Sequence, residues 1–79
     1  MHIEFALPKN ELLTSLALDL LAQELELWAQ THNITILDHG KPKGWSSYQV
    51  LLSDQQHYTV FALTWNPTDS YWASNYSIV

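Results

Sequence analysis

The sequence contains no cysteine and no arginine, and its 79 residues include only two glycines and three lysines. Without cysteine, neither disulfides nor a thiolate zinc site can stabilise the fold, although these are the usual supports of very small secreted domains. The first residues show no basic stretch followed by an apolar stretch, so a secretory signal is not expected. These absences together predict a cytoplasmic protein.

Charged residues are also scarce, at 14% of the chain, where about 25% is usual. Hydrophobic residues make up 47%, which excludes a disordered chain and leaves neutral polar and aromatic groups to cover much of the surface. The formal net charge is −5, and most of the acidic residues lie in the first 32 positions. This distribution disfavours nucleic acid as a direct ligand and favours a basic partner, although the charge could serve solubility alone.

The longest apolar region, from Leu12 to Ala29, is also the best candidate for a membrane segment. It contains Asp19, Gln23, Glu24 and Glu26, so it is not expected to span a bilayer. No membrane partner is therefore predicted.

The pattern of apolar and turn residues predicts a single α+β domain over residues 1–79. Strands are expected at 3–7, 34–38, 46–53 and 57–65, a long helix at 10–31, and an edge strand or ordered tail at 71–78. Asn10 is a suitable N-cap for the helix, and Asn33 tolerates the left-handed conformation that commonly ends one. The expected architecture is one long amphipathic helix packed on a small antiparallel sheet, in the order β-α-β-β-β.

The predicted helix has too much apolar surface for one sheet to cover. A narrow polar stripe contains Ser15, Asp19, Gln23, Glu26 and Gln30, and the apolar arc on the remaining surface spans roughly 240° at about 100° per residue. This arc holds two clusters, one of Leu13, Leu16, Leu20 and Leu27 and one of Leu18, Leu21, Leu25 and Trp28. One cluster should meet the sheet and the other the C-terminal segment, a second copy or a foreign protein. Leu18 and Leu25 are predicted to contact whichever of these three covers the cluster that does not meet the sheet.

Three acidic residues of the helix are candidates for contact with a basic partner. Asp19 and Glu26 lie on the polar stripe, whereas Glu24 lies within the apolar arc. Glu24 could pair with an arginine of a partner or act as an acid with a raised pKa. Alternatively, its aliphatic stem bends to the rim so that its head meets water or a lysine.

Eight of the ten aromatic residues lie between Trp45 and Tyr76. As strands, 46–53 and 57–65 would carry more large apolar side chains than one core face accepts, so a second, aromatic sheet face is predicted. Tyr48, Tyr58 and Trp72 are its proposed contact residues, because such rings are enriched at protein interfaces. The alternatives are that the rings stack on single-stranded bases or simply complete the core.

The sequence shows no arrangement typical of an enzyme, a metal site or a cofactor site. No two of the four histidines have helical metal-ligand spacing, no glycine elbow marks a nucleophile, and no helix is predicted after Gly40 and Gly44 to hold a phosphate. The loop tip with Lys41 and Lys43 is instead expected to be an exposed basic tip.

The function predicted from the sequence is therefore binding without catalysis. A small acidic protein of this kind would dock on a larger protein with a basic surface and block it. Phage-encoded inhibitors of nucleic-acid-binding defence enzymes, such as anti-CRISPR proteins, and bacterial immunity proteins act in this way, but the comparison is one of class without a shared motif. The alternative is a structural subunit or homodimer buried through the leucine-rich helix, and a small enzyme is the least favoured hypothesis.

Overall fold

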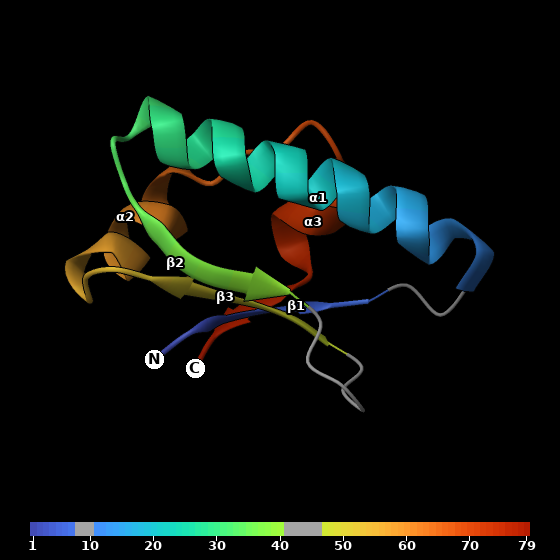
Figure 1. The fold of residues 1–79 in the computed structure, drawn as a ribbon, viewed down its shortest axis with the longest axis horizontal. Helices are drawn as coiled ribbons and strands as arrows, with labels where there is room; N and C mark the ends of the chain where they lie inside the picture. The colour runs from blue at the N-terminus through green and yellow to red at the C-terminus, as the bar shows by residue number, and fades with distance from the viewer. Residues whose placement is uncertain (8–10, 41–46) are drawn as a thin grey trace.

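A computed structural model describes residues 1–7, 11–40 and 47–79 of the chain. The elements in chain order are β1 (Ile3–Ala6), α1 (Glu11–Thr31), β2 (Ile36–Gly40), β3 (Ser47–Leu52), α2 (Gln56–Thr64), α3 (Ser70–Ser74) and β4 (Tyr76–Ile78). The strands form one sheet in the order β2-β3-β1-β4, with every neighbouring pair antiparallel. The predicted α+β fold, with a long helix packed on a small antiparallel sheet, is confirmed (Figure 1). The expected N-cap Asn10 and the expected basic tip at Lys41 and Lys43 lie outside the described residues.

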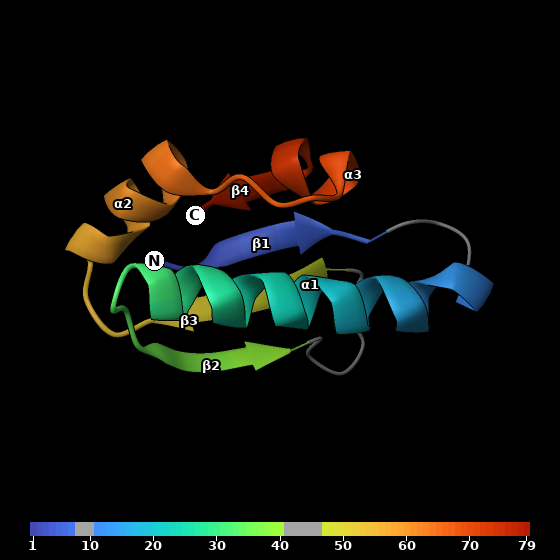
Figure 2. The ribbon, with the colours of Figure 1, turned by 90° about the horizontal axis from the view of Figure 1, so that it is seen from above.

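The sheet is covered on one face only. Along β1, Ile3 and Phe5 are completely buried, whereas the alternate residue Glu4 is half-buried on the opposite face. Tyr48 and Val50 of β3 face the same side as Ile3 and Phe5, their partners across the strand pair. Figures 1 and 2 show α1 above β3, with β2 extending beside the helix and with α2 and α3 over the β1 and β4 side of the same face. The fold is thus a two-layer sandwich of helices on a sheet.

The predicted strand at 57–65 is wrong, because this segment forms α2. As a strand, this segment would be apolar on both faces, so its apolar and polar residues do not alternate as they do in a half-buried strand. Tyr58, Phe61 and Trp65 are buried and recur at intervals of three and four residues, which is the period of a helix. Leu63, on the other side of α2, is 81% exposed. The predicted strand 46–53 is β3, which pairs with β1 and β2.

The C-terminal segment combines a helix and a strand. The Asp69 carboxylate accepts the backbone N–H of Tyr71 and caps the short α3, so the first part of the predicted 71–78 strand is helical. β4 follows and pairs with β1 at the edge of the sheet, which confirms the edge strand for its last part. The Asp69 cap is the local sequence feature that marks the beginning of α3.

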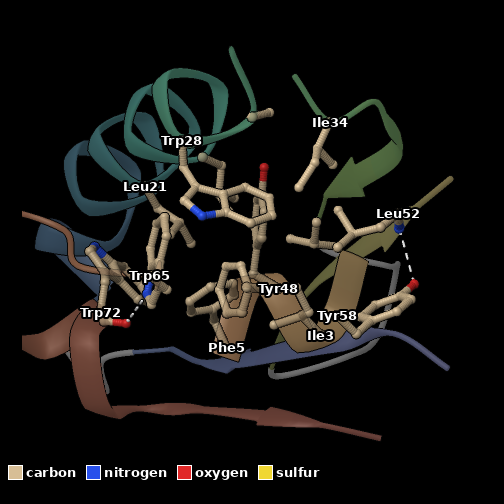
Figure 3. Close-up of a cluster of buried hydrophobic side chains, with 14 residues drawn as sticks. Ile3, Phe5, Leu21, Trp28, Ile34, Tyr48, Leu52, Tyr58, Trp65 and Trp72 are labelled. Carbon is tan, nitrogen blue, oxygen red and sulfur yellow. Dashed lines mark hydrogen bonds between the residues drawn. The ribbon is translucent and has the colours of Figure 1, made fainter. Parts of the chain in front are cut away.

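An aromatic cluster around Phe5 joins the sheet to the helices α2 and α3. The Phe5 ring lies 6.1 Å from Phe61, 5.8 Å from Trp65, 5.9 Å from Trp72 and 5.8 Å from Tyr76, between ring centroids. Most of these contacts are edge-to-face, the geometry that aromatic pairs favour. Figure 3 shows Phe5, Trp65 and Trp72 together on the helix-covered side of the sheet. Phe61, Trp65 and Trp72 of the C-terminal half are therefore part of the core.

Asn33 ends α1 in the way its residue type predicted. Its φ of 55° is left-handed, its N–H donates to the Gln30 carbonyl, and the N–H of Ile34 donates to the Ala29 carbonyl. These two bonds, with buried side chains at Ala29 and Ile34, constitute a Schellman motif. The motif turns the chain sharply from α1 into the sheet.

The left-handed backbone makes Asn33 a sensitive position for stability. Asn33→Val should lower the free energy of unfolding by about 1–2 kcal/mol, because a β-branched side chain is strained at positive φ. Asn33→Gly should be neutral or stabilising by up to about 1 kcal/mol. Urea denaturation of the three proteins measures both effects, and equal midpoints for the valine and glycine variants would contradict the assignment.

Candidate docking surfaces

The outward side of α1 carries a stripe of exposed leucines. Leu16, Leu20 and Leu27 are 66%, 51% and 61% exposed. At about 100° per residue, the three side chains fall within roughly 40° of one another around the helix axis. We refer to these residues as the leucine stripe. Large apolar side chains grouped in this way on a free surface are typical of interaction sites.

Carboxylates flank the leucine stripe on both sides. Asp19 and Glu26 are exposed along one side, and the half-buried Glu24 lies along the other. No lysine or arginine occurs anywhere in α1. The outward side of the helix is therefore apolar along its centre and negative at its rims.

Glu24 links α1 to the segment between α2 and α3. Its carboxylate accepts a hydrogen bond from the Thr68 hydroxyl and one of 3.4 Å from the Thr68 backbone N–H. The contact with Thr68 explains why Glu24 lies within the otherwise apolar arc of α1. The head meets Thr68 instead of the predicted water or lysine, and Glu24 is the acidic residue of the three least available to a partner.

Leu18 and Leu25, the predicted contacts of the second cluster, do not lie on the exposed side of α1. Leu25 is only 1% exposed, and Leu18 is half-buried against the core. They belong to the cluster that packs on the sheet together with Leu21 and Trp28. The helix does carry two leucine clusters, as expected, but the outer one is the leucine stripe.

The predicted aromatic sheet face is also wrong. Tyr48 and Trp72 are buried on the helix-covered side of the sheet. Tyr58 is buried as well, and its hydroxyl donates to the Met1 carbonyl at 2.9 Å and accepts the Leu52 N–H at 3.0 Å. The predicted face depended on a strand at 57–65, where the structure has a helix. Tyr48 on β3, Tyr58 on α2 and Trp72 on α3 are all buried in the core.

The uncovered face of the sheet is polar where β1 and β3 meet. The Glu4 carboxylate lies 3.1 Å from His2 Nε2 and accepts a hydrogen bond of 3.3 Å from the Gln49 amide. These groups satisfy one another on the surface. Among residues 1–7, 11–40 and 47–79, no group of three or more histidine, aspartate or glutamate side chains could hold a metal ion.

A hollow lies where α1 passes β2, at the edge of the sheet. It encloses about 440 Å³ and is lined by Ala22, Leu25, Glu26, Ala29, Gln30, Asn33, Ile34, Thr35, Ile36 and His39. We refer to it as the α1–β2 groove. Of the lining residues, only Leu25 and Glu26 were predicted from the sequence as partner contacts, because the groove depends on how far β2 extends beside the helix.

Tyr48 and His39 meet near the mouth of this groove. The Tyr48 hydroxyl lies within hydrogen-bond distance of His39 Nδ1. Burial, and to a lesser extent the negative charge of Asp38, raises the pKa of Tyr48 above its ordinary value of 10.0. The neutral phenol is therefore the form that the folded domain favours.

This raised pKa predicts a loss of stability in alkaline solution. Above about pH 10 the unfolded chain loses the Tyr48 proton while the folded chain keeps it, so the free energy of unfolding falls until the pH passes the folded pKa. Tyr48→Phe should make the decline between about pH 9 and about pH 11 shallower. Urea denaturation across this range measures the slopes, and identical slopes would contradict the assignment. The difference between the two slopes reports on Tyr48, because wild type and Tyr48→Phe share all other titrating groups.

Within the described residues, no helix is long and apolar enough to cross a membrane. No known protein family matches the chain. No curated protein and no solved structure matches it either.

Proposed function

We propose that this protein is a binding protein that docks the leucine stripe of α1 on a basic surface of a larger protein and blocks that surface. The observation that carries the proposal is the outward side of α1, where three exposed leucines lie between carboxylates. Burial of the leucines would supply affinity, since apolar area removed from water contributes about 25 cal/mol per Å². The flanking carboxylates would select the partner and speed its approach.

The charge of α1 favours a foreign partner over a second copy. Two α1 helices packed through their leucine stripes would bring Asp19 and Glu26 of one copy near the same residues of the other. The helix offers no lysine or arginine to compensate, and like charges facing each other oppose association. A surface rich in lysine and arginine, such as a nucleic-acid-binding site, has the complementary chemistry. Inhibition by occupying such a site is the mode of action that we propose.

The experiment compares variants that change charge equally at two places. Asp19→Lys and Glu4→Lys each change the formal net charge from −5 to −3, but only Asp19 borders the leucine stripe. Tagged wild-type protein is used to capture partners from a lysate of cells that express the protein naturally, and the association rate of each captured protein is measured. Asp19→Lys should slow association at least tenfold at low salt, and Glu4→Lys should have a much smaller effect.

Leu20→Ser tests the apolar part of the same contact. It should raise the dissociation rate while leaving association nearly unchanged, because apolar contacts act mainly after encounter. A captured protein that binds the wild type, Asp19→Lys and Leu20→Ser equally well would exclude the leucine stripe as the docking surface. A wild-type dimer in sedimentation that Leu20→Ser converts to a monomer would assign the stripe to a second copy instead.

A further inference from the structure

We infer that the α1–β2 groove binds an extended segment of a partner chain, which adds as a fifth strand beside β2 and carries a lysine or arginine toward Glu26. This site differs from the leucine stripe, which faces away from the sheet, and Glu26 borders both. Its occupant is a short basic peptide in strand conformation. The inference goes beyond the proposed docking function, because either surface could bind without the other.

β2 is suited to accept another strand because it lies at the end of the sheet order β2-β3-β1-β4. Its only strand partner among the described residues is β3. The backbone N–H and C=O groups on its outer side therefore have no strand to pair with. Exposed sheet edges of this kind bind extended peptides through main-chain hydrogen bonds, and adjacent pockets for alternate side chains provide specificity.

The α1–β2 groove supplies such a pocket directly beside the edge. Its apolar wall comes from α1 and from the chain entering β2, with small alanine side chains leaving room between helix and strand. The apolar lining residues are Ala22, Leu25, Ala29, Ile34 and Ile36. Figure 2 shows β2 extending beside α1 rather than beneath it, so the edge is open to an added strand. An aliphatic side chain of that strand would fill the space over the alanines.

The polar rim of the groove indicates the charge of the occupant. Exposed Glu26 and Gln30 of α1 line one side, and Asp38 of β2 is exposed next to the lining residue His39. α1 and β2 contain no lysine or arginine. Alternate residues of a strand point to the same side, so a lysine or arginine two positions from the aliphatic residue would project toward Glu26.

The shape of β2 argues against a second copy as the occupant. A register shift between Ile36 and Asp38 interrupts its pairing with β3 and sets Leu37 outward, 60% exposed. Bulges bend edge strands and hinder pairing with another long strand of the same kind. Pairing of two β2 strands would also bring the Asp38 carboxylates of the copies together. A short basic peptide avoids the repulsion between carboxylates.

The experiment uses a displayed library of random dodecapeptides, selected on the full-length protein. Parallel selections use Ala22→Leu, which fills the groove, and Ala62→Leu, which adds the same side chain at an exposed position of α2. Circular dichroism and thermal unfolding establish that both variants are folded. Selection on the wild type and on Ala62→Leu should enrich peptides that combine aliphatic residues with lysine or arginine two positions apart, and selection on Ala22→Leu should not.

The enriched peptide is then synthesised to establish how it binds. Ala22→Leu should weaken its affinity at least tenfold and Glu26→Gln about threefold, whereas Leu20→Ser should leave it unchanged. N-methylation of alternate backbone nitrogens should abolish binding in one of the two possible series and spare the other, because an added strand pairs along one edge. In NMR spectra, the amides of residues 35–40 should shift most.

Three results of the peptide experiments would overturn the inference. These are equal enrichment on wild type and Ala22→Leu, a selected peptide pool without basic residues, and loss of binding in both N-methylated series, which would indicate a helical ligand. Self-association of the wild type that Ala22→Leu abolishes would also overturn it and would assign the edge to a second copy. Because Leu20→Ser tests the leucine stripe alone and Ala22→Leu the groove alone, failure of one proposal is distinguishable from failure of the other.

Discussion

Leu25→Glu is expected to unfold the domain, whereas Leu20→Glu, five residues away on the same helix, is expected to leave it folded. Leu25 is 1% exposed and packs within the core, while Leu20 is 51% exposed on the leucine stripe. Replacing a buried leucine loses about 2–5 kcal/mol of packing, and burying an unpaired carboxylate costs several kcal/mol more. A domain of this size is stable by roughly 4–12 kcal/mol, at about 0.05–0.15 kcal/mol per residue. The combined loss is therefore comparable to the whole stability.

Far-ultraviolet circular dichroism and thermal unfolding of the two variants provide the measurement. Leu25→Glu should show no cooperative transition near neutral pH, and Leu20→Glu should melt close to the wild type. The reverse outcome, with Leu25→Glu folded and Leu20→Glu unfolded, would mean that the outer and inner sides of α1 have been exchanged. The pair is well matched, since residue type, substitution and helix are the same and only burial differs.

Phe5→Ala is expected to lower the free energy of unfolding by about 3–5 kcal/mol, the usual cost of removing a buried phenylalanine ring. Phe5 is fully buried and its ring contacts Phe61, Trp65, Trp72 and Tyr76. Each edge-to-face pair contributes about 0.5–1.5 kcal/mol beyond area burial. Because Phe5 joins β1 to α2, α3 and β4, its loss should weaken the whole C-terminal half.

Leu51→Ala is the control, since Leu51 lies on the uncovered face of the sheet and is 41% exposed. Its effect should be below about 1 kcal/mol, as for most substitutions outside a packed core. Urea denaturation followed by tryptophan fluorescence measures both variants. Equal losses at Phe5 and Leu51 would show that the two faces of the sheet are buried alike, contrary to this structure.

The predicted strand at 57–65 and the predicted aromatic sheet face are wrong for the same reason. Between residues 57 and 65 the sequence would be apolar on both faces of a strand. Tyr58, Phe61 and Trp65, however, recur at the spacing of a helix, which the structure has there. Treating the segment as a strand created an aromatic sheet face and moved Tyr48, Tyr58 and Trp72 onto it. As helix α2, the same segment packs beside α1 on the covered face of the sheet, and the three rings are buried in the core.

The leucines of α1 show a different kind of limit. The helical period alone predicted two leucine clusters within one wide apolar arc, and the structure has leucines of one cluster exposed and leucines of the other packed in the core. Which cluster faces the sheet depends on the rotation of the helix about its axis, and the sequence of the helix does not specify that rotation. In the structure, the cluster with Leu21, Leu25 and Trp28 faces the sheet. The Trp28 ring packs against Phe61, with 5.0 Å between the ring centroids.

The sequence by itself determined the α+β class, the long helix and its end at Asn33, the antiparallel sheet and the acidic character of the helix surface. These depend on local properties, namely hydrophobic period, backbone preference and charge, which are present in any short window of residues. Only the tertiary structure decided the sheet order, the exposure of the leucine stripe and the groove beside β2. Each of these depends on contacts between segments far apart in the chain, as between Phe5 and Trp72 or Glu24 and Thr68, and no local pattern encodes how such segments meet.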